Sequence, residues 1–356
     1  MNKPKSILLI KLSAIGDVVH TLPLLEVLRR NFPKTRIDWL IENEAGDIIA
    51  GHDAIDHVII SHRKSWHKRM FKVGEIPKII REISKFIKEL REEKYDMVID
   101  LQGLLKSGVL TGLSRGRRKI GFTGGREGSG LFLTEPPYPV DYDRHAVDRY
   151  LKTAEYLDCR MDAWKGEIPL RASDTKSVDR FISENELQNK CLVALNPMAR
   201  WETKLWEDER FVDLADRIRK DLSCEVIFTG SRHDRPVIDR IIGSMEGGAY
   251  NLAGRTSLKE LADLYSRCRL TVTTDTGPMH IAAAMGCPVV ALFGPTAPWR
   301  TGPYGNGHRV IRTGIECSPC FKKKCTHKTC MKDISVRHVF EAAEELLQKI
   351  PERIRR

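Results

Sequence analysis

The 356-residue chain has no uninterrupted run of about 18 apolar residues, the length needed to span a bilayer. The apolar stretch Ser6–Ile10 follows two lysines, as in a secretory signal. Lys11 interrupts it and no small-residue cleavage site follows, so we interpret it as a strand. We expect a cytoplasmic protein, either free in solution or peripheral on the inner face of the inner membrane.

Two nucleotide-binding signatures are also missing. The absence of G-x-x-x-x-G-K-[ST] argues against a P-loop nucleotidase, and the absence of G-x-G-x-x-G after the first strand argues against a nicotinamide dehydrogenase. The net charge of +11 gathers around residues 63–72 and 115–126, without any DNA- or RNA-binding signature. An anionic substrate or lipid surface explains such basic loops at least as well as nucleic acid does.

The length is more than one hydrophobic core usually needs, so two domains are expected. Strand and helix patterns alternate in both halves: strands at 6–12, 36–41, 57–60, 97–100, 118–122, 192–195, 226–229, 270–273 and 289–293, and helices at 20–31, 75–92, 145–157, 207–221, 257–268 and 336–349. This alternation predicts two doubly wound α/β domains, residues 1–172 and 173–356, joined by a polar linker at 171–176. The final helix is a candidate to pack back on the first domain. Ligands are expected in the cleft between the domains, at the carboxyl ends of the strands.

The stretch Thr273–His280 predicts a strand, a short turn and a helix with Pro278 in its first turn. Backbone N–H groups and the positive end of the helix dipole suit a phosphate there. Thr276 adds a hydroxyl donor, Gly277 permits close approach, and His280 lies one turn into the helix. A plain helix cap without a ligand is an equally good interpretation of this stretch alone.

Two charged residues also follow predicted strands. Asp17 lies beside Gly16 just after the first strand; an aspartate is ionised at neutral pH and can act as a base, although aspartates cap helices very often. Lys204 follows the first strand of the second domain and is suited to a pyrophosphate, unless it is an ordinary solvated lysine. A charge pair near 4 Å is worth about 4 kcal/mol at an effective dielectric constant of 20, against about 0.3–1 kcal/mol from the helix dipole. Lys204 is therefore expected to dominate the affinity for a pyrophosphate.

The nine cysteines fall into two groups. Cys159, Cys191, Cys224, Cys268 and Cys287 are scattered and are expected to be small core hydrophobes. The remaining four, Cys317, Cys320, Cys325 and Cys330, lie within fourteen positions in a spacing that fits no standard zinc finger. A structural role in a surface loop is favoured over a metal site or a redox-sensitive clamp. The D-x-D sequence Asp141–Asp143 is interpreted as a helix cap rather than as a metal site.

Taken together, several ordered motifs resemble glycosyltransferase family 9, the ADP-heptose:lipopolysaccharide heptosyltransferases. The resemblance covers nearly the whole chain and is carried by residues 11–23, 100–107, 145–147, 204–206, 274–280 and 293–296. It implies a GT-B fold, an inverting and metal-independent reaction without a cofactor, and ADP-heptose as the donor. The implied acceptor is the anionic, lipid-linked Kdo/heptose inner core of lipopolysaccharide.

The resemblance also implies roles for residues. Asp17 becomes the general base, opposite the donor site. Donor binding is assigned to Lys204, Asp275, Thr276, Gly277, His280, Ala199, Arg200, Leu252 and Thr256, with Gly230 and Ser231 near the nucleotide. Asp275 is expected to fix the loop or a donor hydroxyl, because a carboxylate repels phosphate. Acceptor binding is assigned to Ser13, Arg63, Lys64, Lys68, Gln102, Lys106 and Arg126. A monomer that binds no nucleic acid is expected.

Other interpretations stay open at the level of sequence. The motif at Asp100–Ser107 resembles the first heptosyltransferase of the core pathway, whereas the cysteine-rich loop resembles the second, so the acceptor is not fixed. A transferase of a different NDP-sugar on the same fold is one alternative. A non-catalytic binder of anionic lipid or nucleic acid, using the basic loops, is another.

Overall fold

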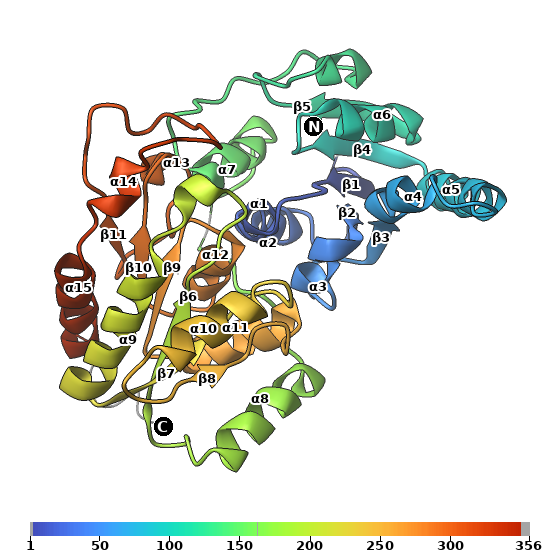
Figure 1. The fold of residues 1–356 in the computed structure, drawn as a ribbon. Helices are drawn as coiled ribbons and strands as arrows, with labels where there is room; N and C mark the ends of the chain where they lie inside the picture. The colour runs from blue at the N-terminus through green and yellow to red at the C-terminus, as the bar shows by residue number, and fades with distance from the viewer. Residues whose placement is uncertain (1–2, 162, 350–356) are drawn as a thin grey trace. The chain divides into compact units, whose positions relative to one another are not determined.

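The computed structural model describes residues 3–161 and 163–349, and the chain divides between Pro169 and Leu170 into two compact units. Both units are built from a parallel sheet with helices between the strands (Figure 1). The two doubly wound α/β domains predicted from the sequence are therefore confirmed. None of the helices in these residue ranges combines the length and the apolar character needed to cross a bilayer.

The first unit contains a five-stranded sheet in the order β3-β2-β1-β4-β5. Its strands are β1 (Ser6–Ile10), β2 (Arg36–Glu42), β3 (His57–Ser61), β4 (Tyr95–Asp100) and β5 (Gly116–Gly121), and its helices are α1 (Ile15–Val19), α2 (Leu22–Asn31), α3 (Gly46–Ile49), α4 (Arg63–Arg69), α5 (Ile76–Leu90), α6 (Leu105–Leu113) and α7 (Ala146–Tyr156). β1 is buried along its whole length. Since successive side chains point to opposite faces, this central strand supplies apolar side chains to both layers of helices.

The long amphipathic helix expected at 75–92 is present as α5. Its apolar stripe is only partly covered, however. Ile79, Phe86 and Leu90 join the core beneath the helix, whereas Ile76, Ile80 and Ile83 remain exposed.

The second unit contains a six-stranded sheet in the order β11-β10-β9-β6-β7-β8. Its strands are β6 (Cys191–Asn196), β7 (Cys224–Phe228), β8 (Tyr250–Asn251), β9 (Leu270–Thr274), β10 (Val289–Leu292) and β11 (Arg309–Ile311), and its helices are α8 (Ala172–Glu184), α9 (Asp208–Leu222), α10 (Arg235–Gly243), α11 (Leu258–Arg267), α12 (Gly277–Ala284), α13 (Pro298–Thr301), α14 (Thr329–Lys332) and α15 (Val336–Lys349). α11 begins with a capping box in which Ser257 and Glu260 satisfy each other's backbone N–H groups.

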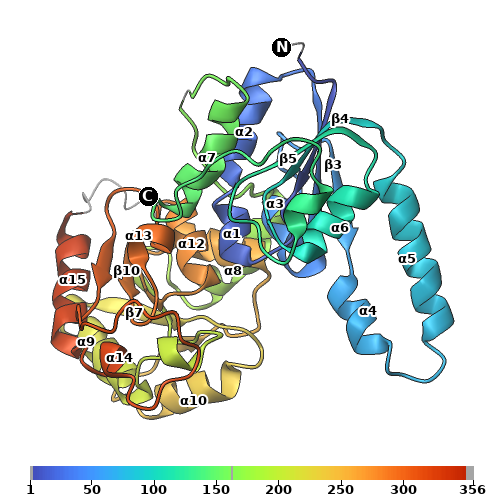
Figure 2. The ribbon, with the colours of Figure 1, turned by 90° about the horizontal axis from the view of Figure 1, so that it is seen from above.

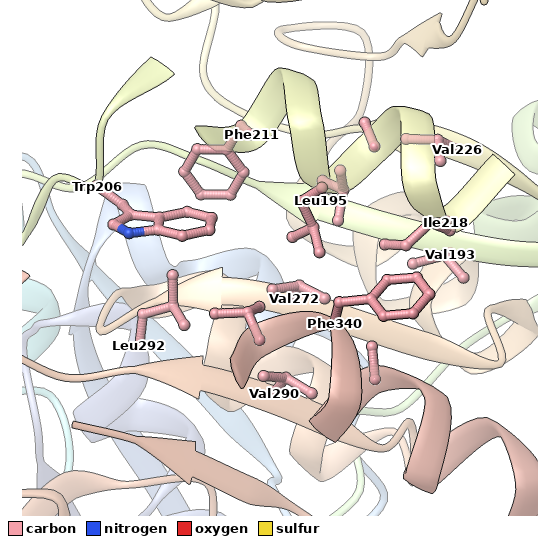
Figure 3. Close-up of a cluster of buried hydrophobic side chains, with 14 of the residues drawn as sticks. Val193, Leu195, Trp206, Phe211, Ile218, Val226, Val272, Val290, Leu292 and Phe340 are labelled. Carbon is pink, nitrogen blue, oxygen red and sulfur yellow. The ribbon is translucent and has the colours of Figure 1, made fainter. Parts of the chain in front are cut away.

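The core of the second unit lies between its sheet and helices α9, α10 and α15 (Figure 3). Phe211 from α9 packs against Trp206, with ring centres 5.0 Å apart, and Phe340 from α15 lies beside Ile218 and Val193. The final helix α15 therefore packs within the second unit, where it contacts α9, β9, β10 and β11.

Three sequence expectations are wrong. The proposed linker at 171–176 is the first part of α8: Asp174 accepts the N–H of Arg171 as in a capping box, and Val178 and Ile182 bury one face of the helix. The polar residues that suggested a turn are those of an exposed first helical turn.

The second correction concerns Asp141–Asp143, which does not cap a helix. Asp141 accepts the N–H of Asp143 in a local turn, while the N-cap of α7 is His145, whose ring accepts the N–H of Val147. The third concerns Cys191 and Cys224. They oppose each other in register on β6 and β7, with Cα atoms 4.6 Å apart, and form a disulfide rather than two free core thiols.

Candidate active site

In each sheet the strand order reverses once, between β1 and β4 in the first unit and between β6 and β9 in the second. Loops that leave neighbouring strands in opposite directions at such a point open a crevice at the carboxyl edge of the sheet. The segment after β1 carries Ser13 and Asp17, and the segment after β4 carries Gln102 and Lys106. The segments after β6 and β9 carry Lys204 and the stretch from Asp275 to His280. These predicted residues thus follow the strands that flank the two switch points.

Asp17 lies in the first turn of α1, and its side chain is 35% exposed. Its carboxylate accepts the N–H of Ala14 at 3.2 Å and the hydroxyl of Tyr150 at 3.3 Å. Lys11 Nζ lies 4.0 Å away. The residue therefore does have the capping contact suggested by sequence statistics. That contact holds one oxygen, and the group stays accessible to a ligand.

Lys11 is buried beneath Asp17 and donates to Tyr150 Oη at 2.6 Å and to the carbonyl of Leu101 at 3.1 Å. Burial lowers the pKa of Lys11, and the nearby charges of Asp17 and Asp100 partly offset that effect. Burial also raises the pKa of Tyr150 well above its usual value, with Asp17 adding to the shift. Tyr150 consequently remains a neutral phenol that links the lysine to the carboxylate.

The loop after β4 is fixed to the loop after β1 by its side chains. Gln102 Oε1 accepts the backbone N–H groups of Leu12 and Ser13 at 3.2 and 3.1 Å, and Lys106 Nζ donates to Ser13 Oγ at 2.9 Å. Asp100 accepts from Gln102, Gly103 and Ser107, which fixes the start of the loop. The side-chain carbonyl oxygen of Gln102 therefore binds the protein backbone. Its amide N–H₂ is the group that can donate a hydrogen bond to a ligand.

Glu42, at the end of β2, organises the basic residues of this edge. The carboxylate is 1% exposed and pairs with Arg63, Lys64 and Lys106 at 2.8, 2.8 and 3.2 Å. Although burial alone raises the pKa of Glu42, the ion pairs outweigh it and lower the pKa to about 2. Three cations around one carboxylate leave an excess of positive charge facing solvent, which suits an anionic ligand.

The other two predicted acceptor residues lie outside this cluster. Lys68 is exposed on α4, one turn beyond Lys64. Arg126 is exposed in the loop after β5, and its backbone N–H donates to the carbonyl of Gly103 at 2.9 Å. This backbone contact places the Arg126 loop beside Gly103, the residue that follows Gln102.

In the second unit, Lys204 and Asp275 form an ion pair of 2.5 Å with both side chains largely buried. Thr296 Oγ1 donates to the same carboxylate at 2.6 Å, and Lys204 Nζ also lies 4.6 Å from the centre of the Trp201 ring. Asp275 therefore holds the lysine at the carboxyl edge of the sheet, consistent with its expected role in fixing the loop.

α12 begins immediately after this carboxylate, with Thr276 as its N-cap and Pro278 in its first turn. Thr276 and Gly277 are half-buried at the start of the helix. The ring of His280 is only 7% exposed, one turn further in. The expected strand–turn–helix is present.

The remaining donor residues lie on the neighbouring loops. Ala199 is half-buried and Arg200 exposed after β6, where Thr274 Oγ1 donates to the carbonyl of Met198 at 3.1 Å. Leu252 is buried at the end of β8 and Thr256 is half-buried. The N–H of Gly254 donates to the carbonyl of Gly230 at 2.9 Å, which joins the loops after β7 and β8.

The clustered cysteines are free thiols. Within residues 3–161 and 163–349, no group of three or more His, Cys, Asp or Glu side chains is arranged to hold a metal ion. Burial raises the pKa of Cys330, and the nearby thiols of Cys320, Cys317 and Cys325 raise it further. Hydrogen bonds from the Lys328 and His327 N–H groups instead lower the pKa of Cys325. A structural role for the cluster stays a prediction.

Four site residues were missed from the sequence: Lys11, Glu42, Tyr150 and Thr296. Glu42 directly follows the strand predicted at 36–41, and that position was the available signal. Thr296 stands in one of the recognised motifs, but nothing connected it with Asp275. Tyr150 is one residue of a helix far along the chain, and no local pattern distinguishes it.

Comparison with known proteins shows which family this chain is similar to. The sequence profile of "Glycosyltransferase family 9 (heptosyltransferase)" matches residues 83–331. Lipopolysaccharide heptosyltransferase 1 of Pseudomonas aeruginosa is 32% identical over 348 residues, covering 95% of this chain and 92% of the relative.

Solved structures give the same picture. A family 9 glycosyltransferase from Veillonella parvula superposes with a TM-score of 0.82 at 26% identity, covering 97% of this chain and 98% of the other. Escherichia coli heptosyltransferase WaaC, solved with ADP and with ADP-2-deoxy-2-fluoro heptose, gives TM-scores of 0.77 and 0.74 at 25% identity. Both of these comparisons cover 96% of this chain and 99% of WaaC.

Proposed function

The chain belongs to glycosyltransferase family 9, and from that premise we propose that it moves a heptose from ADP-heptose to the Kdo/heptose inner core of lipopolysaccharide. It is a glycosyltransferase with the GT-B fold. The choice of donor is supported by the relatives, which are named heptosyltransferases, and by WaaC, which was solved with ADP and an ADP-heptose analogue. Lipopolysaccharide as acceptor is likewise supported by the relatives' names.

In this proposal the second unit binds the donor. Lys204 faces the diphosphate, and the N–H groups at the start of α12 orient it. Leu252 and Thr256, on loops joined through Gly254 and Gly230, line the nucleotide site. When the bond between the sugar and the diphosphate breaks, the lysine stabilises the negative charge that grows on the departing ADP.

Asp17 acts as the general base. An acceptor hydroxyl attacks the anomeric carbon from the face opposite ADP, so the configuration inverts. The new carbon–oxygen bond forms as the bond to the diphosphate breaks, and the hydroxyl proton passes to the Asp17 carboxylate. Tyr150 and the N–H of Ala14 hold that carboxylate in place. Proton removal by a positioned group contributes about 10²–10⁴-fold to the rate.

The acceptor's carboxylates and phosphates bind to Arg63, Lys64 and Lys106, which Glu42 holds together. Gln102 offers its amide N–H₂ beside them, and Lys68 and Arg126 extend the positive surface. Basic side chains that are already ordered lose less conformational freedom on binding than mobile ones do. The reaction in this scheme requires no metal ion, because Lys204 and the helix terminus supply the charge stabilisation.

The observation that carries the proposal is the placement of Asp17 at the β1/β4 switch point, partly exposed and held through Tyr150 by a buried lysine. We expect Asp17→Asn to lower the turnover number for ADP release by about 10²–10⁴-fold, with ADP affinity changed less than a few-fold. The measurement is steady-state ADP release from ADP-heptose with a Kdo-containing acceptor, repeated in EDTA.

A suitable control is Asp96→Asn. Asp96 also accepts a backbone N–H, from Lys5 at 2.6 Å, but it lies near the amino end of β4. This variant is expected to keep normal turnover. Unchanged turnover in Asp17→Asn would remove Asp17 from the mechanism, and loss of activity in EDTA would refute the metal-free scheme.

A further inference from the structure

The loop between α4 and α5 exposes large apolar side chains. Phe71 is 77% exposed and Val73 is fully exposed at the tip, and Met70 at the end of α4 is 47% exposed. Ile76 and Ile80 continue the apolar surface along α5. Contiguous exposed apolar residues on a folded domain mark an interaction surface far more often than isolated ones do.

The same segment is strongly basic. Residues 63–88 contain nine lysines and arginines and two glutamates, Glu75 and Glu82. Arg69 pairs with both glutamates, at 2.8 and 2.9 Å. Lys72, Lys78 and Arg81 are exposed close to the apolar tip. An apolar tip ringed by positive charge has the composition of a segment that rests on an anionic membrane.

Side-chain contacts join α4, α5 and the loop between them into one α4–α5 hairpin. Trp66 from α4 donates to Glu82 of α5 at 2.9 Å and packs against Phe86 with ring centres 5.5 Å apart. The Arg69 pairs close the two helices together just before the tip. In Figure 2 the two helices and their loop extend away from the sheet of the first unit. The apolar side chains are thus presented on a fixed support.

We propose that this α4–α5 hairpin docks on an anionic bilayer, with Phe71 and Val73 entering the interfacial layer and the surrounding basic residues contacting lipid phosphates. Charge selects this occupant, because the central parts of protein–protein interfaces are depleted of lysine. The inference rests on the proposed function in one respect: docking there brings α4, which carries Arg63, Lys64 and Lys68, to the surface where a lipid-linked acceptor resides.

The test uses flotation of the full chain with vesicles of phosphatidylethanolamine and phosphatidylglycerol, and with vesicles of phosphatidylcholine alone. We expect binding to the anionic vesicles that weakens as salt rises. The double variant Phe71→Ser/Val73→Ser should lower the partition coefficient at least about tenfold. Lys72→Gln/Arg81→Gln should lower it about fivefold for each charge removed. Val310→Ser is the control, because Val310 is an exposed valine on β11 of the other unit.

Equal binding to both kinds of vesicle, or wild-type binding by the Phe71→Ser/Val73→Ser variant, would overturn the proposal. So would a dimer in sedimentation equilibrium that this variant dissociates, since a second copy would then be the occupant. Transfer to a water-soluble, deacylated acceptor separates docking from catalysis. The variant should retain that activity while losing transfer to an acceptor embedded in vesicles. If the wild type transfers heptose to neither acceptor, the proposed function fails while the vesicle result stands on its own.

Discussion

Glu42 and Asp275 each hold lysine side chains at the carboxyl edge of a parallel sheet. Both carboxylates are nearly excluded from solvent, and both have hydrogen-bonding partners that fix their orientation. A lysine has considerable rotamer freedom, which an anion binding to it would otherwise have to remove. The buried carboxylates remove much of that freedom in the folded protein itself, before any substrate arrives.

The Glu42 cluster gives a pH-dependent prediction. Burial alone would raise the pKa of Glu42, but pairing with Lys64, Arg63 and Lys106 lowers it from 4.5 to about 2. Because the folded-state pKa lies below that of the unfolded chain, the carboxylate stabilises the fold above about pH 4.5. This contribution disappears as the pH falls towards 2.

We expect Glu42→Gln to lower the free energy of unfolding by roughly 2–3 kcal/mol at pH 6 and by little near pH 2. Urea unfolding of wild type and variant across this range measures the difference. Glu44→Gln is the control, because Glu44 is half-exposed and makes only a 3.4 Å contact with Lys64. A difference that stays constant with pH would show that the charge of Glu42 is not the cause.

Among the elements, the loops after β7 and β8 depend on close backbone packing. Gly254 has a φ of +68°, and a Cβ atom there would lie 2.6 Å from the Cα of Arg232. The left-handed conformation and this contact together require glycine. The loop that carries Thr256 is therefore positioned by the backbone of the neighbouring loop.

Gly254→Ala is expected to destabilise the protein by about 1–3 kcal/mol and to weaken ADP binding. Gly243→Ala is its matched control: Gly243 ends α10, and an added Cβ would meet no atom within 4 Å. Urea unfolding and ADP titration of both variants test the idea. Normal stability in Gly254→Ala would mean that the two loops can separate without cost.

The sequence predicted best those helices and strands whose apolar residues form a clear pattern. α15 has the predicted limits, and β2 and β9 end within one residue of theirs. α1 and α6 were missed, since α1 is only five residues long and Leu105–Leu113 contains two glycines. The polar start of α8 looked like a linker because exposed helical turns and loops share a composition.

Some residues of the candidate site could be suggested from the sequence, and others could not. Asp17 was singled out because it stands just beyond a strand, whereas its proposed role and the choice of Gln102 came from motifs that resemble a known family. Glu42 on β2 contacts Lys106, and Tyr150 on α7 contacts Asp17. The partners are far apart in the sequence, so a single sequence does not show that they meet. Predicting contacts of this kind requires knowledge of the register of the sheet and the packing of the helices.

For the molecule as a whole, each unit has its own sheet, its own core and its own switch point. The proposed donor residues all belong to the second unit, and the proposed base and acceptor residues all belong to the first. In the proposed scheme, nucleotide binding needs only the second unit, whereas transfer needs both units.

We accordingly expect ADP to slow backbone hydrogen exchange in the loops after β6, β8 and β9, with little change in the first unit. Lys204→Ala should weaken ADP binding about a hundredfold or more, because it removes the cation that is proposed to face the diphosphate. Isothermal titration checks the affinity. Lys259→Ala is the control, since Lys259 is also a largely buried lysine, paired with Asp174 at 3.3 Å. Equal ADP affinity in the two variants would refute the role of Lys204.

The pairing of Lys204 with Asp275 also bears on which anions the proposed donor site attracts. A lysine whose charge is balanced by its neighbour exerts a weak pull on small ions such as inorganic phosphate. A dinegative diphosphate that also gains the α12 amides and a nucleotide pocket can compete for the ammonium group, whereas a lone phosphate has less to offer. In the proposed reaction, Asp275 pairs with Lys204 again once ADP departs, and the proposed donor site is then ready for the next sugar nucleotide.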